Sequence, residues 1–113
     1  MFPKYHRLHN SKEFLSVIRF SCAESSNFLQ VFVRPNNLLY SRLGLIVAGK
    51  VERLAVKRNL AKRILRTAFS EHQKDFVGLD VVVRLRCAVT RGEASRMKEE
   101  YKALLVKLHK CCG

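Results

Sequence analysis

Three stretches of the chain repeat their apolar residues with the period of an α-helix. In the first, Asn10 and Glu13 have the spacing of a capping box, in which each side chain bonds the other residue's backbone at a helix start. Phe14 and Ile18 follow one turn apart. This pattern predicts a short helix over residues 11–19.

Two longer helices are predicted further along the chain. The hydrophobic period is 3.6 from about residue 54 to residue 72. A last helix is predicted from about residue 93 to residue 110, where Glu93 suits the positive N-terminal end. Its apolar stripe consists of Met97, Tyr101, Leu104, Leu105 and Leu108.

Three other stretches predict β-strands. Residues 27–35 are rich in aromatic and β-branched side chains and end in the turn signal Pro35-Asn36-Asn37. Residues 42–49 form a second strand, and residues 79–86 begin as a continuous apolar run, typical of a strand buried on both faces. The element order is α-β-β-α-β-α. We therefore expect an α+β fold, a two-layer sandwich in which helices pack on a small mixed sheet.

Length and apolar content favour a single domain over residues 1–113. The chain has 113 residues, near the commonest domain size, and 48% of them are apolar, enough for a hydrophobic core. No internal repeat or Gly/Ser/Pro-rich linker divides it.

The charge balance points to an anionic partner. There are 22 Lys and Arg residues against 9 Asp and Glu, which gives a net charge of +13. Such an excess repels itself in the compact state unless anions are near, and clustered cations are typical of nucleic-acid binding. The alternative is a basic protein with an inert surface.

The helix predicted around residues 55–69 concentrates this charge on one side. At about 100° per residue, one face collects Arg58, Asn59, Lys62, Arg63 and Arg66. The opposite arc collects Val56, Leu60, Ala61, Ile64, Leu65 and Ala68 and is expected to be buried. Like charges four residues apart destabilise a helix, so a stripe without acids favours nucleic-acid contact over an inert, solvated face. Lys50 and Arg53 extend the cationic surface upstream.

Several classes of protein are disfavoured by what the sequence lacks. No apolar run is long enough for a signal peptide or a membrane span, so we expect a cytoplasmic protein without membrane contact. The cysteines do not form two spaced C-x-x-C pairs, although His109, Cys111 and Cys112 could form a fortuitous metal site. No clustered acids or Gly-rich phosphate loop offers a catalytic or metal centre.

Four motifs in order resemble the protein subunit of bacterial ribonuclease P. They are R-L with K-E-F at residues 7–14, R-L-G-L-I-V at residues 42–47, A-V-x-R-N-x-x-K-R-x-x-R at residues 55–66 and D-V-V-V at residues 80–83. The resemblance implies a subunit that assists a catalytic RNA in removing the 5′ leader of precursor tRNA. It also implies a left-handed β-α-β crossover, against the usual rule.

The resemblance further implies partners and site residues. Arg58, Asn59, Lys62, Arg63 and Arg66 would contact the catalytic RNA. A cleft between the first helix and the sheet would bind the leader, lined by Phe14, with Ile18 where the family has a second aromatic and Phe20 or Phe28 as substitutes. From the residues alone, Phe14 suits either core packing or stacking on a base. The chain would bind no cofactor itself, Mg²⁺ would accompany the RNA, and the complex would be 1:1.

The sequence departs from the family pattern at two places. Leu60 replaces an arginine usual in the motif, and the loop from Ala48 to Arg53 aligns only Lys50 with the family's paired lysines. Two other functions remain open: a ribosomal or other structural RNA-binding protein of the same architecture, and a self-sufficient nuclease.

Overall fold

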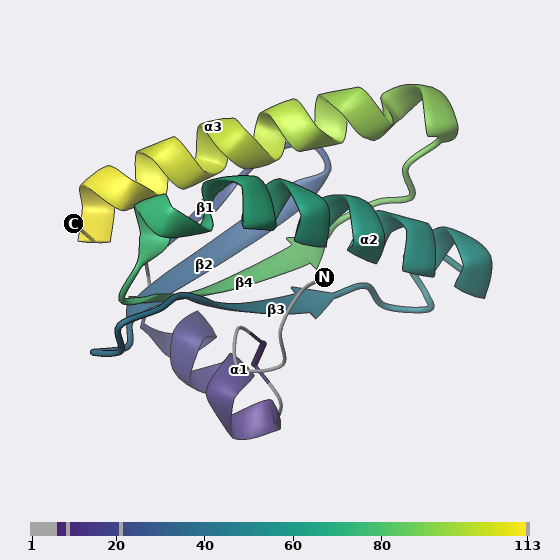
Figure 1. The fold of residues 1–113 in the computed structure, drawn as a ribbon. Coiled ribbons are helices and arrows are strands. Elements are labelled where there is room, and N and C mark those ends of the chain that lie inside the picture. Colours follow the sequence, from purple (N-terminus) through teal and green to yellow (C-terminus); the bar gives the residue numbers. More distant parts are fainter. Residues whose placement is uncertain (1–6, 9, 21, 113) are drawn as a thin grey trace.

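The computed structural model describes residues 7–8, 10–20 and 22–112 (Figure 1). Its helices and strands are α1 (Ser11–Arg19), β1 (Cys22–Ser25), β2 (Leu29–Pro35), β3 (Arg42–Ile46), α2 (Ala55–His72), β4 (Leu79–Leu85) and α3 (Ala94–Cys112). Two short 3-10 helices, Gln73–Phe76 and Arg91–Glu93, precede β4 and α3. The predicted helices and the three predicted strands are confirmed to within a few residues at their ends.

The capping box that predicted α1 is present. The Asn10 side chain accepts a hydrogen bond from the Glu13 amide at 3.0 Å, and the Glu13 carboxylate accepts one from the Asn10 amide at 3.3 Å. These bonds satisfy amides that a helix start leaves unpaired, and they fix the first residue of α1.

The four strands form one mixed sheet in the order β1-β2-β4-β3. β2 pairs antiparallel with both β1 and β4, whereas β3 pairs parallel with β4. The sequence did not predict β1, and the element order is α-β-β-β-α-β-α. β1 spans four residues of which only Cys22 is buried, so it lacks a hydrophobic alternation, and its pairing with β2 fixes it instead.

The parallel pair β3 and β4 requires a crossover, which α2 supplies. In Figure 1 the chain leaves β3 at the near edge of the sheet, rises into α2 above it and descends into β4 behind β3. Seen along the strands, this turn is left-handed, as the family resemblance implies. Most β-α-β crossovers are right-handed.

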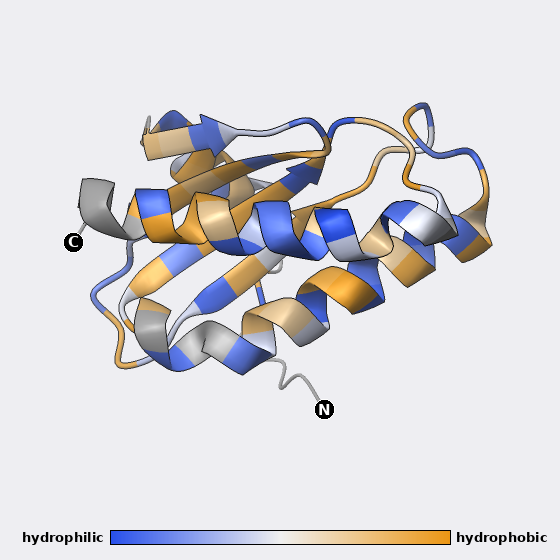
Figure 2. Cartoon of the chain, turned by 90° about the horizontal axis from the view of Figure 1, so that it is seen from above, coloured by the Kyte–Doolittle hydropathy of each residue, from blue (hydrophilic) through white to orange (hydrophobic). Residues whose placement is uncertain are grey.

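Helices cover both faces of the sheet. α2 and α3 lie side by side over one face (Figure 2), and α1 lies against the other (Figure 1). Val81 and Val83 of β4 join the core under α2 and α3, while Val82 between them joins the cluster under α1. The α+β class is confirmed, but the expected two layers become three. Because side chains alternate along a strand, an unbroken apolar run such as β4 needs a cover on each face.

A buried ion pair ties α1 to the sheet. Asp80 on β4 is 1% exposed and accepts bonds from Arg42 Nε at 2.8 Å and Nη2 at 2.7 Å. Arg42 Nη1 also bonds the Glu13 carboxylate on α1 at 3.0 Å, and Asn36 Nδ2 bonds Asp80 at 2.8 Å. The bond to Asp80 raises the pKa of Arg42 above its usual value. One guanidinium thus sets the position of α1 relative to β3 and β4.

Candidate nucleic-acid interface

The cationic stripe of α2 faces away from the core over most of the helix. Ala61, Leu65, Ala68 and Phe69 are buried against the sheet and α3. Among the polar residues of the stripe, Asn59 and Arg63 are exposed, and Arg58, Lys62 and Arg66 are half-buried. The two-sided helix that the sequence predicts is therefore confirmed in its central and C-terminal turns.

The first turns of α2 differ from the prediction. Val56 is 80% exposed and Leu60 is 39% exposed, so neither belongs to a buried arc. Figure 1 shows the reason: this end of α2 extends beyond the ends of β3 and β4, where no sheet lies beneath it. Both side chains instead line an apolar groove of about 470 Å³, whose other wall includes Val89 and Met97.

Arg58 binds the loop that precedes its own helix. Its Nη1 donates to the carbonyl oxygens of Glu52, at 2.9 Å, and Arg53, at 3.0 Å. The Glu52 carboxylate is buried and accepts a bond from the Leu54 amide at 3.2 Å. Lys50 and Arg53, both exposed, are carried by this loop. Arg58 thus positions two other predicted RNA contacts, a role that sequence reasoning missed because the bonds go to backbone carbonyls.

Phe14, a residue of α1, packs in a hydrophobic cluster and also lines a pocket. Its ring joins the cluster of Leu8, Val17, Phe32 and Val82. The ring also lies against Gly44 of β3, where a Cβ atom would overlap it. The core packing weighed from the sequence is therefore confirmed, and it is compatible with a place in the lining of a cleft, which the resemblance implies.

The other residues predicted to line the cleft lie in three different surroundings. Ile18 packs against the same cluster as Phe14 but does not line the pocket. Phe20 is exposed at the end of α1. Phe28 is buried on the opposite face, with the Arg96 guanidinium 5.6 Å from its ring centroid, so its proposed role as a substitute in the cleft is wrong.

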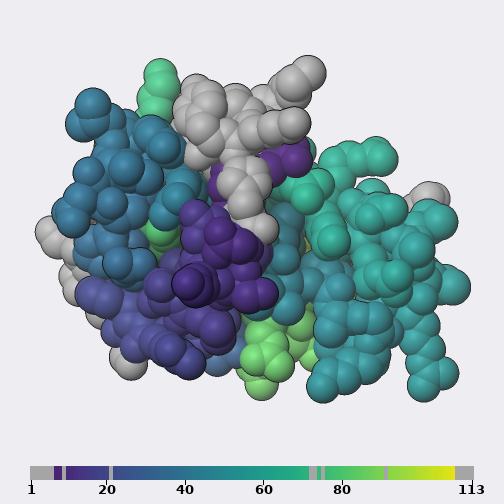
Figure 3. Space-filling model, turned by 90° about the horizontal axis from the view of Figure 1, so that it is seen from below, coloured from purple at the N-terminus to yellow at the C-terminus, as the bar shows by residue number. Residues whose placement is uncertain are grey.

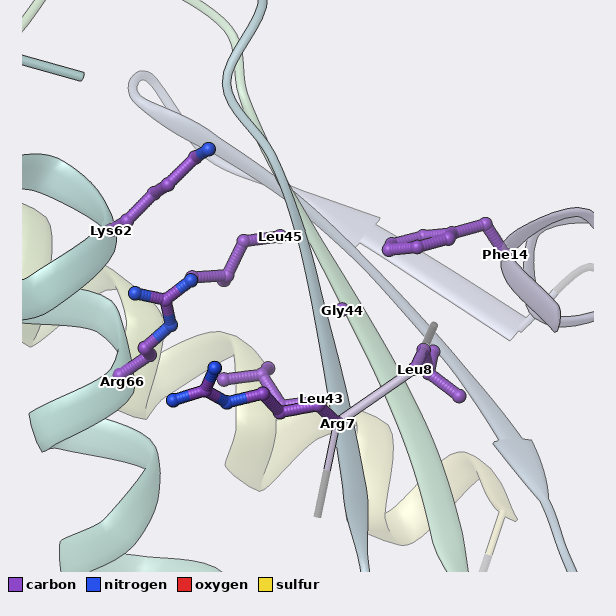
Figure 4. A pocket seen from close by; sticks show the side chains of 8 residues that line it. All are labelled: Arg7, Leu8, Phe14, Leu43, Gly44, Leu45, Lys62 and Arg66. Carbon is purple, nitrogen blue, oxygen red and sulfur yellow. The ribbon is translucent and has the colours of Figure 1, made fainter. Parts of the chain in front are cut away.

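The pocket at the edge of β3 brings the two predicted sites together (Figure 4). It measures about 110 Å³. Its lining comes from the 7–8 segment, α1, β3 and α2, namely Arg7, Leu8, Phe14, Leu43, Gly44, Leu45, Lys62 and Arg66. We call it the edge pocket. Figure 3 shows α1 and α2 on either side of the strip that contains β3. The remaining predicted contacts, Lys50, Arg53, Arg58, Asn59 and Arg63, do not line it.

Arg7 was not singled out as a contact by the sequence, although it belongs to the first motif. The 7–8 segment pairs in parallel with the open edge of β3, and the Leu8 amide donates to the Leu43 carbonyl at 2.9 Å. This pairing brings Arg7 beside Arg66. Partial burial, together with the Arg7 charge, lowers the pKa of Arg66 from its usual value. The Arg66 guanidinium still remains charged near neutral pH, because arginine titrates far above it.

Comparison with known proteins identifies the family. The model of the family described as Ribonuclease P matches residues 2–109. The chain belongs to the ribonuclease P protein family. The ribonuclease P protein component of Chromobacterium violaceum is 41% identical over 110 residues, covering 97% of this chain and 91% of that protein. The one from Nitrosomonas europaea is 39% identical over 105 residues, covering 93% and 88%.

Solved ribonuclease P proteins share the fold. The protein from Thermotoga maritima is 26% identical, with a TM-score of 0.70 over 95% of this chain and 97% of that one. The protein from Staphylococcus aureus superposes with a TM-score of 0.78, covering 88% of this chain and 92% of that one. At 22% identity the second likeness speaks to the fold alone.

Leu60 stands where the ribonuclease P family pattern has an arginine, and the structure changes what this difference means. A buried leucine would have exchanged an RNA contact for core stability. The partly exposed Leu60 instead contributes to a surface groove beside the cationic stripe.

Neither a membrane span nor a metal cluster is found in the part of the chain that the structure describes. No helix there is both long and apolar enough to cross a membrane. No three His, Cys, Asp or Glu residues there are placed to hold a metal ion together. The site suggested by His109, Cys111 and Cys112 lies outside the described side chains.

Proposed function

We propose that the chain is the protein subunit of ribonuclease P, which binds the catalytic RNA and the 5′ leader of precursor tRNA. The observation that carries this proposal is the edge pocket. It joins the cationic stripe of α2 to the aromatic Phe14 of α1 around one strand edge. A family member with such a surface can hold two RNA segments at once.

The stripe of α2 is the proposed contact with the catalytic RNA. Arg63 and Asn59 are exposed, and Arg58 binds the backbone of the loop that carries Lys50 and Arg53. Guanidinium groups match phosphate geometry, and each neutralised phosphate releases condensed counterions. Binding should therefore weaken steeply with salt.

The α1 side of β3 is the proposed contact with the leader. Phe14 offers an aromatic face held between its own cluster and Gly44. Stacking of a base on an aromatic ring tolerates different sequences, which suits a subunit that meets many leaders.

The chain supplies binding and positioning, while the catalytic RNA supplies the reacting centre and holds Mg²⁺. The carboxylates of Glu13 on α1 and Asp80 on β4 are engaged by Arg42, so we assign them no metal or proton-transfer role. The complex is a 1:1 endoribonuclease that acts in the cytoplasm and yields the mature 5′ end of tRNA.

Reconstitution tests the proposal. The protein is mixed with the cognate catalytic RNA at low Mg²⁺, and cleavage of precursor tRNA should exceed that by the RNA alone. No gain over RNA alone would reject it. Near-stoichiometric copurification of ribosomal RNA would favour a structural RNA-binding protein, and cleavage by RNA-free protein would favour a nuclease.

A further inference from the structure

We infer that Glu13 is a positioning residue for the 5′ leader, because its carboxylate ties α1 to Arg42 of β3 and this tie holds the ring of Phe14 in place. The inference rests on the proposed function, in which Phe14 stacks on a base of the leader. It adds to the site a residue that acts through its neighbour in the chain and does not itself contact RNA.

The two oxygens of the Glu13 carboxylate bind different parts of the molecule. Oε1 accepts a hydrogen bond from the Asn10 amide at 3.3 Å, which closes the capping box of α1. Oε2 accepts a hydrogen bond from Arg42 Nη1 at 3.0 Å. The first bond is local to the helix, and glutamine can make it as well as glutamate. The second bond joins the helix to the sheet and is an ion pair.

The sheet fixes the guanidinium that Glu13 binds. Arg42 Nε and Nη2 donate to the two oxygens of the buried Asp80 carboxylate at 2.8 and 2.7 Å. The two residues are also register partners in the parallel pair of β3 and β4. Two parallel bonds of this kind fix the orientation of the guanidinium plane. The position of Nη1 is therefore set by the strands, and α1 is held where Glu13 can reach it.

Phe14 converts this tie into a property of the cleft. It follows Glu13 on α1, and its ring lies against Gly44, two residues after Arg42 on β3. Of the nine residues of α1, only Phe14 lines the edge pocket. The other contacts of α1 with the sheet include an apolar cluster, and apolar contacts are not directional. Without the ion pair, the short helix can shift over this cluster and carry the ring away from Gly44.

Glu13→Gln separates the two bonds of the carboxylate. Glutamine keeps an oxygen for the Asn10 amide, so the cap remains, but it is neutral and forms no ion pair with Arg42. The substitution also removes a negative charge, which by attraction alone would strengthen binding to RNA. Weaker binding would therefore come from geometry. Glu24→Gln is the matched control, because Glu24 is exposed on β1, the edge strand opposite β3.

The test uses the full chain assembled with its cognate catalytic RNA. It measures affinity for precursor tRNA that carries either a long leader or a leader of a single nucleotide. Glu13→Gln should weaken binding of the long-leader precursor about fivefold, the scale of one charged hydrogen bond that is partly exposed. It should not weaken binding of the single-nucleotide precursor or of the catalytic RNA. Glu24→Gln should weaken none of the three.

A double-mutant cycle shows whether Glu13 acts through Phe14. Phe14→Ala should itself weaken binding of the long-leader precursor, and adding Glu13→Gln should cause no further loss. NMR of the free protein gives a readout that needs no RNA. The ring current of Phe14 should displace the Gly44 Hα resonance in the wild type and in Glu24→Gln, and this displacement should diminish in Glu13→Gln.

Each part of the inference can fail on its own. If Glu13→Gln binds the long-leader precursor as Glu24→Gln does, Glu13 has no positioning role and the proposed function stands. If Glu13→Gln weakens binding equally with and without the Phe14 ring, or leaves the Gly44 resonance unchanged, it does not act through Phe14 and the inference is rejected. If the wild type does not stimulate cleavage, the proposed function fails and the inference fails with it.

Discussion

The ring of Phe14 on α1 lies against the backbone of Gly44 on β3, so closely that a Cβ atom at Gly44 would overlap the ring. The parallel pairing of β3 with β4 holds the Gly44 backbone in place, and Arg42 and its partners hold α1. Neither side of the contact can move without disturbing a bond elsewhere.

Gly44→Ala should therefore displace the Phe14 ring. We expect a loss of about 1–3 kcal/mol in the free energy of unfolding, typical of overpacking, together with weaker leader binding. Denaturant unfolding and leader-RNA titration measure the two effects. Gly92→Ala is the matched control, because a Cβ there meets nothing within 4 Å. Equal stability of the two variants would contradict the close contact.

Arg58→Ala should loosen the loop that carries Lys50 and Arg53. The substitution removes two hydrogen bonds to the loop backbone, and because the side chain is partly exposed we expect a stability loss of only about 1 kcal/mol. Amide hydrogen exchange over residues 48–54 should accelerate.

Arg63→Ala provides the comparison for Arg58→Ala. Arg63 is exposed on the same helix, and its loss should leave loop exchange unchanged and stability within about 0.5 kcal/mol. Both variants should weaken binding to the catalytic RNA and flatten its salt dependence. Unchanged loop exchange in Arg58→Ala would limit Arg58 to RNA contact.

Leu60→Arg should restore a cation without unfolding the helix. Because Leu60 is partly exposed over a groove, we expect a stability loss below about 1 kcal/mol and a several-fold gain in affinity for the catalytic RNA. Val56→Arg adds the same charge at a more exposed position of the same groove and separates general attraction from a specific contact. A loss above about 2 kcal/mol would show that Leu60 acts as a core residue.

Tyr101→Phe should stabilise the protein. The Tyr101 side chain is fully buried, and its hydroxyl has no hydrogen-bond partner among the described residues, a cost of about 1–3 kcal/mol that phenylalanine avoids. Thermal unfolding at neutral pH should show the gain, and destabilisation would indicate that the hydroxyl is bonded.

The same hydroxyl should make the wild-type protein less stable to unfolding at alkaline pH. Burial raises the pKa of Tyr101 well above its usual value of 10.0. The unfolded chain releases this proton at a lower pH than the folded chain, so the free energy of unfolding does not change with this group below about pH 10 and falls progressively above it. Tyr101→Phe should show a shallower loss of stability between neutral pH and pH 11. Parallel profiles would contradict a raised pKa.

The sequence was most informative where one local pattern decides the structure. The capping box of Asn10 and Glu13 fixed the start of α1, and the one-sided charge of α2 located the cationic stripe. It was least informative where tertiary pairing decides. β1 exists because β2 offers it an edge, and a helical projection of Leu60 could not show that the sheet ends before reaching it. Likewise, Arg7 joins the pocket only because its segment pairs with β3.

The pairing of the 7–8 segment with β3 is also relevant to solubility. Within the described residues it covers the strand edge at Leu43 and stops before Leu45. An uncovered edge invites a second copy to add its own strand. Arg7, Lys62 and Arg66 surround this edge, so two copies approaching there would bring six positive charges together. This concentration of like charge would oppose pairing between two copies of the free protein at this edge.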